Sequence, residues 1–352
     1  MEQKNLYAAI LAVSFTCLVP VSPSFAQDGK LRDAQVAVLQ AEGPKAALIL
    51  RGLVESSLPM SKWDQRRTRC GLSRLEGKHS IPQPAFSGDD FADQIVRIYR
   101  SYWQQAIDPA KREMSEKWLF DQLRRAIRRP QIKDRDAILE EVSNQLNARN
   151  IYNTQGKTAA LYDLLLYLRE DETPYKVNLP DGTSYDVKVF LLKNMISHGW
   201  SRYFNCGGPG TAGFATEQGL YAIAEVYDLE SEDFRISFLT HETRHYADYE
   251  RYPGLEGPEL EYRAKLTELA LADKTLSGLL DTFSTDQGDD RATPHSFANK
   301  QVLNALRRQL KLEATTDLKS IDPTKLREAA RLLLLKDNQE RDEARGKAPT
   351  KP

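Results

Sequence analysis

The feature that most constrains this chain is the five-residue stretch His241-Glu242-Thr243-Arg244-His245. Two histidines four positions apart on a helix project from the same face, one turn apart, so both imidazoles can reach one metal ion. The glutamate beside the first histidine points toward the same place and can take a proton from water bound there. The stretch therefore predicts a helix that carries a metal site.

The flanking residues favour two consecutive helices around this stretch. Ser231-Glu232-Asp233 is a typical helix start, and Pro253-Gly254 is a typical stop. Between them, Phe234, Phe238 and the two histidines recur at helical spacing, which turns the histidines inward. Pro258 opens a second helix, and a helix that folds back on the first could deliver a carboxylate as the third ligand.

An HExxH helix, a turn and a following helix with glutamates resemble the gluzincin class of zinc metallopeptidases, over residues 185–310. In that class the third ligand is a glutamate on the next helix in a Glu-x-x-Ala-like setting, which Glu261 and Ala264 match. The resemblance implies one Zn²⁺ held by His241, His245 and Glu261. It also implies hydrolysis of peptide bonds by attack of zinc-bound water, with Glu242 as the general base.

Alternatives to this ligand set come from neighbouring acids. Glu268 and Glu259 are the other candidates for the third ligand. The metzincin class is disfavoured, because it would need a glycine and a further ligand where this chain has Asp248 and Arg251. A straight helix cannot aim Asp248 at the same ion as both histidines, so we expect it to hydrogen-bond a ligating imidazole.

A hydrolase also needs a donor for the negative charge that develops on the attacked carbonyl oxygen. His295 and Tyr262 are the candidates for this catalytic role. The alternative for His295 is a loop histidine beside a helix start, and for Tyr262 it is packing between helices.

The rest of the chain predicts an α+β fold that is predominantly helical, with a zincin-like catalytic part and a small antiparallel or mixed sheet. Residues 27–172 read as packed helices, with caps at Asp89 and Asp134 and a helical run at Leu161–Leu168. Residues 173–335 form the catalytic domain, which begins with a β-hairpin around Pro180-Asp181-Gly182. Residues 336–352 are expected to be a disordered tail.

A strand is expected at 219–227, and its Leu220–Val226 part could either pair with a peptide substrate or be an ordinary sheet strand. Another amphipathic helix is expected to begin at His295.

Residues 1–26 have the pattern of a secretory signal peptide, and no later segment is apolar enough to cross a bilayer. We therefore expect an exported protein, periplasmic or secreted, without stable membrane insertion. Cys70 and Cys206 then form one disulfide or stay as two free thiols. The formal net charge of -1 gives no argument for a nucleic-acid partner.

The function expected from these observations is an exported zinc metallopeptidase that acts on a peptide or protein substrate. Three alternatives stay open. One is a hydrolase of cell-wall peptides, and another is a non-catalytic, zinc-stabilised periplasmic binding or assembly protein. The third is a helical interaction protein in which the motif at 241–245 is fortuitous. The sequence does not indicate an oligomeric state.

Overall fold

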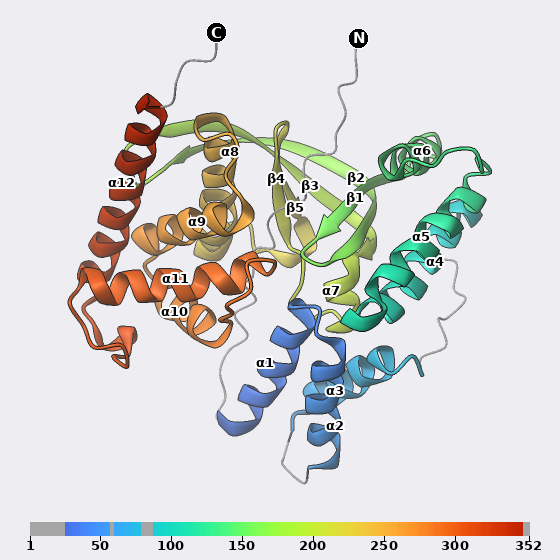
Figure 1. The fold of residues 1–352 in the computed structure, drawn as a ribbon, viewed down its shortest axis with the longest axis horizontal. Helices are drawn as coiled ribbons and strands as arrows, with labels where there is room; N and C mark the ends of the chain where they lie inside the picture. The colour runs from blue at the N-terminus through green and yellow to red at the C-terminus, as the bar shows by residue number, and fades with distance from the viewer. Residues whose placement is uncertain (1–24, 57–59, 79–86, 348–352) are drawn as a thin grey trace. The chain divides into compact units, whose positions relative to one another are not determined.

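The structure, a computed structural model, describes residues 25–56, 60–78 and 87–347 (Figure 1). The expected signal peptide lies almost entirely outside these residues. The chain divides into two compact units: residues 1–171 with 191–212, and residues 172–190 with 213–352. The chain first crosses from one unit to the other after residue 171, and residues 191–212 return to the first unit.

The first unit is built from helices around an aromatic core. Its elements are α1 (Phe25–Leu39), α2 (Gly43–Glu55), α3 (Lys62–Leu75), α4 (Asp90–Ala106), η1 (Pro109–Lys111), α5 (Arg112–Ala126), α6 (Arg135–Asn147), β1 (Tyr152–Thr158) and α7 (Gly199–Phe204). Asp89 and Asp134 cap α4 and α6 through their carboxylates, as predicted. Tyr99 and Trp103 of α4 are fully buried in a core shared with Trp200 and Phe204 of α7.

The sheet contains five strands among the described residues, in the order β1-β2-β3-β5-β4. Its long members, β2 (Leu161–Asn178) and β3 (Ser184–His198), both continue from one unit into the other. The hairpin between them turns at residues 179–183, where Gly182 has a φ of +87°, as the sequence predicted. The helix expected at Leu161–Leu168 is wrong: this apolar run is the start of β2 and pairs with β1.

One edge strand of the sheet is β4 (Gly213–Thr216), which pairs antiparallel with β5 (Gly219–Ile223). The sequence left two alternatives for Leu220–Val226, a peptide-binding edge or an ordinary sheet strand. The structure has the ordinary strand, because β5 lies between β3 and β4 and the chain then passes into the short helix η2 (Ala224–Val226). Strand β4 has only four residues and follows a glycine-rich stretch. It is therefore too short for an alternating sequence pattern to predict it.

The second unit is mostly helical beyond these strands. Its elements are η3 (Phe234–Thr240), α8 (His241–Arg251), α9 (Gly257–Leu271), α10 (Leu276–Thr285), α11 (Pro294–Gln309), η4 (Leu318–Ser320) and α12 (Pro323–Lys347). Leu266 and Leu269 of α9 lie in a core with Val302, Leu306 and Leu334 from the later helices. The α+β fold class predicted from sequence is confirmed.

Helix α12 continues twelve residues, 336–347, into the tail that was expected to be disordered from residue 336. Acidic and amide side chains of this part of α12 bind residues of other elements. Arg263 contacts Asp337 and donates a 2.8 Å hydrogen bond to Asn338 Oδ1. Tyr252 donates a 3.0 Å hydrogen bond to Asp342 Oδ1. These charged residues are helical because they bind partners on α8 and α9, which composition cannot reveal.

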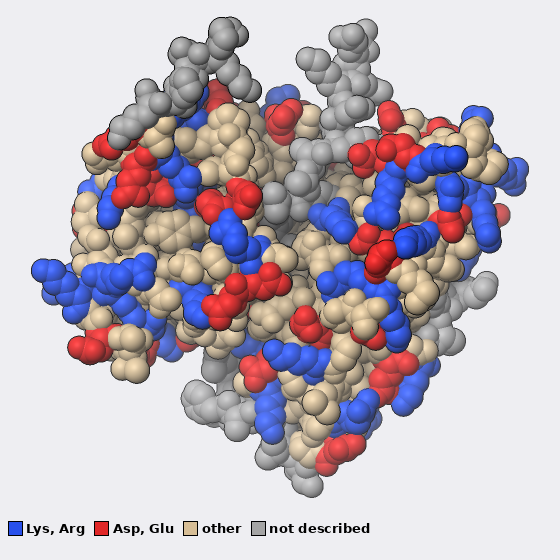
Figure 2. Space-filling view, viewed as in Figure 1, with Lys and Arg blue, Asp and Glu red and all other residues tan. Residues whose placement is uncertain are grey.

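Two further observations concern the expectation that the protein is exported. Cys70 of α3 and Cys206, which follows α7, form a disulfide with Cα atoms 6.2 Å apart. Within the described part of the chain, no helix combines the length and apolarity needed to span a bilayer. On the face in Figure 2, acidic and basic side chains are interspersed, in keeping with the small formal net charge.

Candidate metal centre

The metal helix begins with an unusual turn. Ser231 Oγ accepts a 3.0 Å hydrogen bond from the amide of Phe234, which confirms the predicted helix start. Residues Phe234–Thr240 then form a π-helix, in which Thr240 Oγ1 donates to the carbonyl of Arg235 at 2.8 Å. π-Helical turns occur frequently at functional sites. The segment becomes a regular α-helix at His241, the first residue of the motif.

The two histidines converge as the sequence predicted. Their Nε2 atoms lie 3.0 Å apart, and the rings are nearly perpendicular at 87°. Both residues are buried, with at most 2% of their surface exposed. The pair therefore has two nitrogen atoms close enough to share one ion.

Glu261 of α9 completes the group. Its Oε1 lies 3.3 Å from His245 Nε2, and its Oε2 lies 3.7 Å from His241 Nε2. Bonds of about 2.0–2.2 Å put the ligand atoms of a tetrahedral metal ion such as zinc about 3.3–3.6 Å apart. The three separations, of 3.0, 3.3 and 3.7 Å, bracket that range. Among the described residues, this is the one group of three potential ligands whose atoms all lie within 4.8 Å of one another.

Glu268, considered as a ligand, has a different place. Its Oε1 lies 2.6 Å from His241 Nδ1. A carboxylate on Nδ1 fixes the tautomer that leaves the lone pair on Nε2 free for a metal. Burial lowers the pKa of His241, but Glu268, Glu261 and Glu242 outweigh it and raise the pKa to about 9. Glu259, the other alternative, pairs with Arg291 on the exposed side of α9.

Glu242 is fully buried on α8, one position after the first histidine. Its charge, with burial and Glu261, raises the pKa of Tyr249, whose ring stacks on His245 with centroids 6.5 Å apart. Glu261 is also buried, which opposes its ionisation. The charge of His295, hydrogen bonds with His245 and His295, and the charge of His241 outweigh burial and hold the pKa of Glu261 well below its usual range.

The candidates for a carbonyl-stabilising donor lie in different surroundings. His295, at the start of α11, is 21% exposed and has Nδ1 2.7 Å from Glu261 Oε2. Tyr262 packs against the helical core of the second unit. Burial and Asp337 raise its pKa to about 12. Tyr262 thus has the packing position that was its alternative, whereas His295 adjoins the ligand group.

Asp248 does not bond an imidazole. Its carboxylate accepts two hydrogen bonds from Arg263, at 2.7 Å from Nε and 2.8 Å from Nη2. The expectation for Asp248 is wrong. Its side chain lies two turns beyond His241 and meets Arg263 of α9 instead of an imidazole. The role that it was given belongs to Glu268, which approaches His241 from α9.

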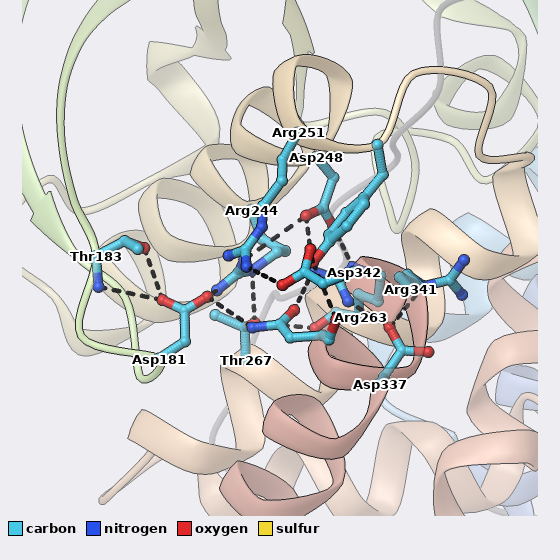
Figure 3. A network of polar contacts seen from close by, with 12 residues as sticks. Asp181, Thr183, Arg244, Asp248, Arg251, Arg263, Thr267, Asp337, Arg341 and Asp342 are labelled. Atoms are coloured by element: carbon cyan, nitrogen blue, oxygen red, sulfur yellow. Dashed lines mark hydrogen bonds and ion pairs between the residues drawn. The ribbon is translucent and has the colours of Figure 1, made fainter. Parts of the chain in front are cut away.

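The Asp248–Arg263 pair is the centre of a buried network that the sequence did not reveal (Figure 3). Arg244, inside the metal motif, donates to Asp181 Oδ2 of the hairpin turn at 2.8 Å and to Thr267 Oγ1 at 3.2 Å. Asp181 is held in turn by the amide and hydroxyl of Thr183. The network thus joins the hairpin turn, α8, α9 and α12 beside the ligand-bearing turns. No signal in the sequence pairs Asp181 with Arg244, because 63 residues separate them.

Comparisons with known proteins add no relative to this description, because no family model, no curated protein and no solved structure matches the chain.

Proposed function

We propose that this chain is a zinc-dependent hydrolase that cleaves peptide bonds. The observation that carries the proposal is the buried group of His241, His245 and Glu261, with Glu242 beside it. Two nitrogens and one oxygen suit a tetrahedral zinc ion with a fourth position for water or substrate. When bound, Zn²⁺ supplies a Lewis acid that polarises a carbonyl group and lowers the pKa of water to about 7.

The charge of the surroundings supports a divalent cation. The carboxylates of Glu242, Glu261 and Glu268 are all buried, and one buried ammonium, of Lys265, lies beside Glu261. With neutral imidazoles, this leaves two negative charges away from solvent. Buried charges are costly unless paired or bound to a metal, and one divalent ion would neutralise them.

Each residue then has a role in hydrolysis. His241, His245 and Glu261 would hold the ion, and Glu268 would keep His241 in the metal-binding tautomer. Glu242 would accept the proton of the attacking water and pass it to the nitrogen of the departing amine. The edge strand β4 packs against α8 and could pair with the main chain of an extended peptide.

The test compares three proteins: wild type, Glu242→Gln and His241→Ala. We expect wild type to hold one zinc per chain by metal analysis and to cleave labelled protein or cell-wall peptides. Glu242→Gln should keep the zinc but lose about 10²–10⁴-fold in kcat, because the general base is gone. His241→Ala should lose both. A folded wild-type protein without zinc would overturn the proposal.

A second candidate is a zinc-stabilised binding or assembly protein without turnover. It is favoured by the burial of the centre, since the three ligands and Glu242 are each at most 2% exposed. In that case zinc raises the thermal midpoint, but wild type and Glu242→Gln are equally inactive on every peptide. Under either function we propose that the protein works outside the cytoplasm, where the disulfide is stable.

A further inference from the structure

Lys265 is a buried lysine next to the proposed metal ligands. It lies on α9 one turn after Glu261 and is only 6% exposed. Its Nζ is 3.7 Å from Glu261 Oε2 and 4.8 Å from the centre of the Phe283 ring. Lysines are almost never buried unless they are paired. Lys265 is paired with the carboxylate of Glu261, the third residue of the candidate ligand group.

The two oxygens of Glu261 have different neighbours. Oε1 faces His245 Nε2 at 3.3 Å. Oε2 lies 2.7 Å from His295 Nδ1, 3.7 Å from Lys265 Nζ and 3.7 Å from His241 Nε2. Because His295 and Lys265 compete with an ion for Oε2, which we call the outer oxygen, Oε1 is the oxygen that is more available to an ion. That arrangement keeps the coordination number low and leaves a position open.

Lys265 also sets the charge of the centre. Without its ammonium, the carboxylates of Glu242, Glu261 and Glu268 would carry three negative charges instead of two. The nearby pairs Arg244–Asp181 and Arg263–Asp248 are each neutral, so they do not compensate. Every cation in the centre therefore experiences the opposing field of Lys265.

We propose that Lys265 is a positioning residue that holds the outer oxygen of Glu261, so that Glu261 binds zinc through one oxygen, and that limits the affinity for the ion. The inference rests on the proposed function, because it assigns Lys265 a role toward the same ion. It makes an unusual prediction: removal of Lys265 tightens metal binding, whereas a defect in packing would weaken it.

The experiment measures Zn²⁺ affinity by competition with a chromophoric chelator, and the visible spectrum of the Co²⁺-substituted protein. Lys265→Met should bind Zn²⁺ roughly tenfold more tightly or more, since a neighbouring positive charge is lost at low effective dielectric. Its Co²⁺ absorption should weaken, because Oε2 of Glu261 then keeps only His295 as a competing basic partner and can approach the ion, which raises the coordination number. Lys265→Arg keeps the charge and should bind like wild type. Lys274→Met, an exposed lysine just after α9, is the matched control.

Three outcomes are distinct. Tighter binding by Lys265→Met, with Lys265→Arg and Lys274→Met unchanged, supports the inference. Equal or weaker binding by Lys265→Met with wild-type circular dichroism overturns it, as does equal tightening by Lys265→Arg. If Lys265→Met does not fold, Lys265→Gln takes its place with the same expectations. Failure of wild type to bind any divalent ion would instead overturn the proposed function.

Discussion

At the scale of single residues, the proposed metal centre depends on which nitrogen of His241 is available to an ion. His241 presents Nε2 because Glu268 occupies its Nδ1 at 2.6 Å. Hydrogen-bond partners of this kind typically contribute 10–100-fold to metal affinity. Glu268 therefore has a measurable role although it does not belong to the ligand group.

We predict that Glu268→Ala weakens Zn²⁺ binding by about 10–100-fold, because His241 loses both its orientation and a neighbouring negative charge. The measurement is competition with a chromophoric chelator. Glu259→Ala is the control, because Glu259 lies on the same helix and pairs with Arg291 at the surface. Equal weakening by both substitutions, or none by Glu268→Ala, would contradict this role.

Sequence reasoning at this scale succeeded where one helix determines the geometry. The spacing of His241 and His245 predicted their convergence, because four residues make about one turn. Asp248 was expected on an imidazole and Glu268 was left open as an alternative ligand, for the opposite reason. Which acid meets an imidazole depends on the rotation of α9 against α8, and a single sequence contains no information about that rotation.

At the scale of elements, the hairpin turn is attached to the metal helix by one buried ion pair. Asp181 Oδ2 accepts from Arg244 Nη2 at 2.8 Å, and the side chains are only 1–2% exposed. Burial alone would raise the pKa of Asp181, but Arg244 and the hydrogen bonds from Thr183 outweigh it and lower the pKa to about 2. The ionised carboxylate therefore stabilises the folded state.

The sign of the pH dependence follows from this lowered pKa. The contribution is fully present above the unfolded pKa of about 4 and is lost as pH falls through 2. We predict that Asp181→Asn lowers the free energy of unfolding by about 2 kcal/mol at pH 7 and by about half of that at pH 3. Urea unfolding followed by circular dichroism measures the difference.

Asp186→Asn is the control for this prediction, because Asp186 is exposed on β3 of the same hairpin. It should change stability little at any pH. A deficit of Asp181→Asn that stays constant between pH 7 and pH 3 would show that the ion pair with Arg244 is not its cause.

Elements were predictable where local chemistry determines them. Asp89, Asp134 and Ser231 cap the helices that follow them, and a cap needs only neighbouring residues. The apolar run Leu161–Leu168 was assigned to a helix, but it is a strand buried along most of its length. A continuous apolar run fits either state, and only the pairing with β1 decides between them.

At the scale of the whole molecule, the chain leaves the first unit in β2, returns in β3 and leaves again after residue 212. No composition change marks residues 191–212, so their membership of the first unit could not be predicted. A disulfide attaches this returning segment to the rest of the first unit, because Cys206 within it is bonded to Cys70 of α3. Both cysteines belong to the first unit, whereas the metal group belongs to the second.

This division predicts separate effects of reduction. The disulfide links residues 136 apart, and a loop of that length corresponds to about 5 kcal/mol in the chain-entropy model, with measured values commonly about 2–5 kcal/mol. All four tryptophans, at 63, 103, 118 and 200, lie in the first unit, so their fluorescence reports on that unit alone. We predict that the Cys70→Ser, Cys206→Ser double variant shows an earlier fluorescence transition in urea and unchanged zinc content. Loss of zinc together with the early transition would mean instead that the ligand group depends on an intact first unit.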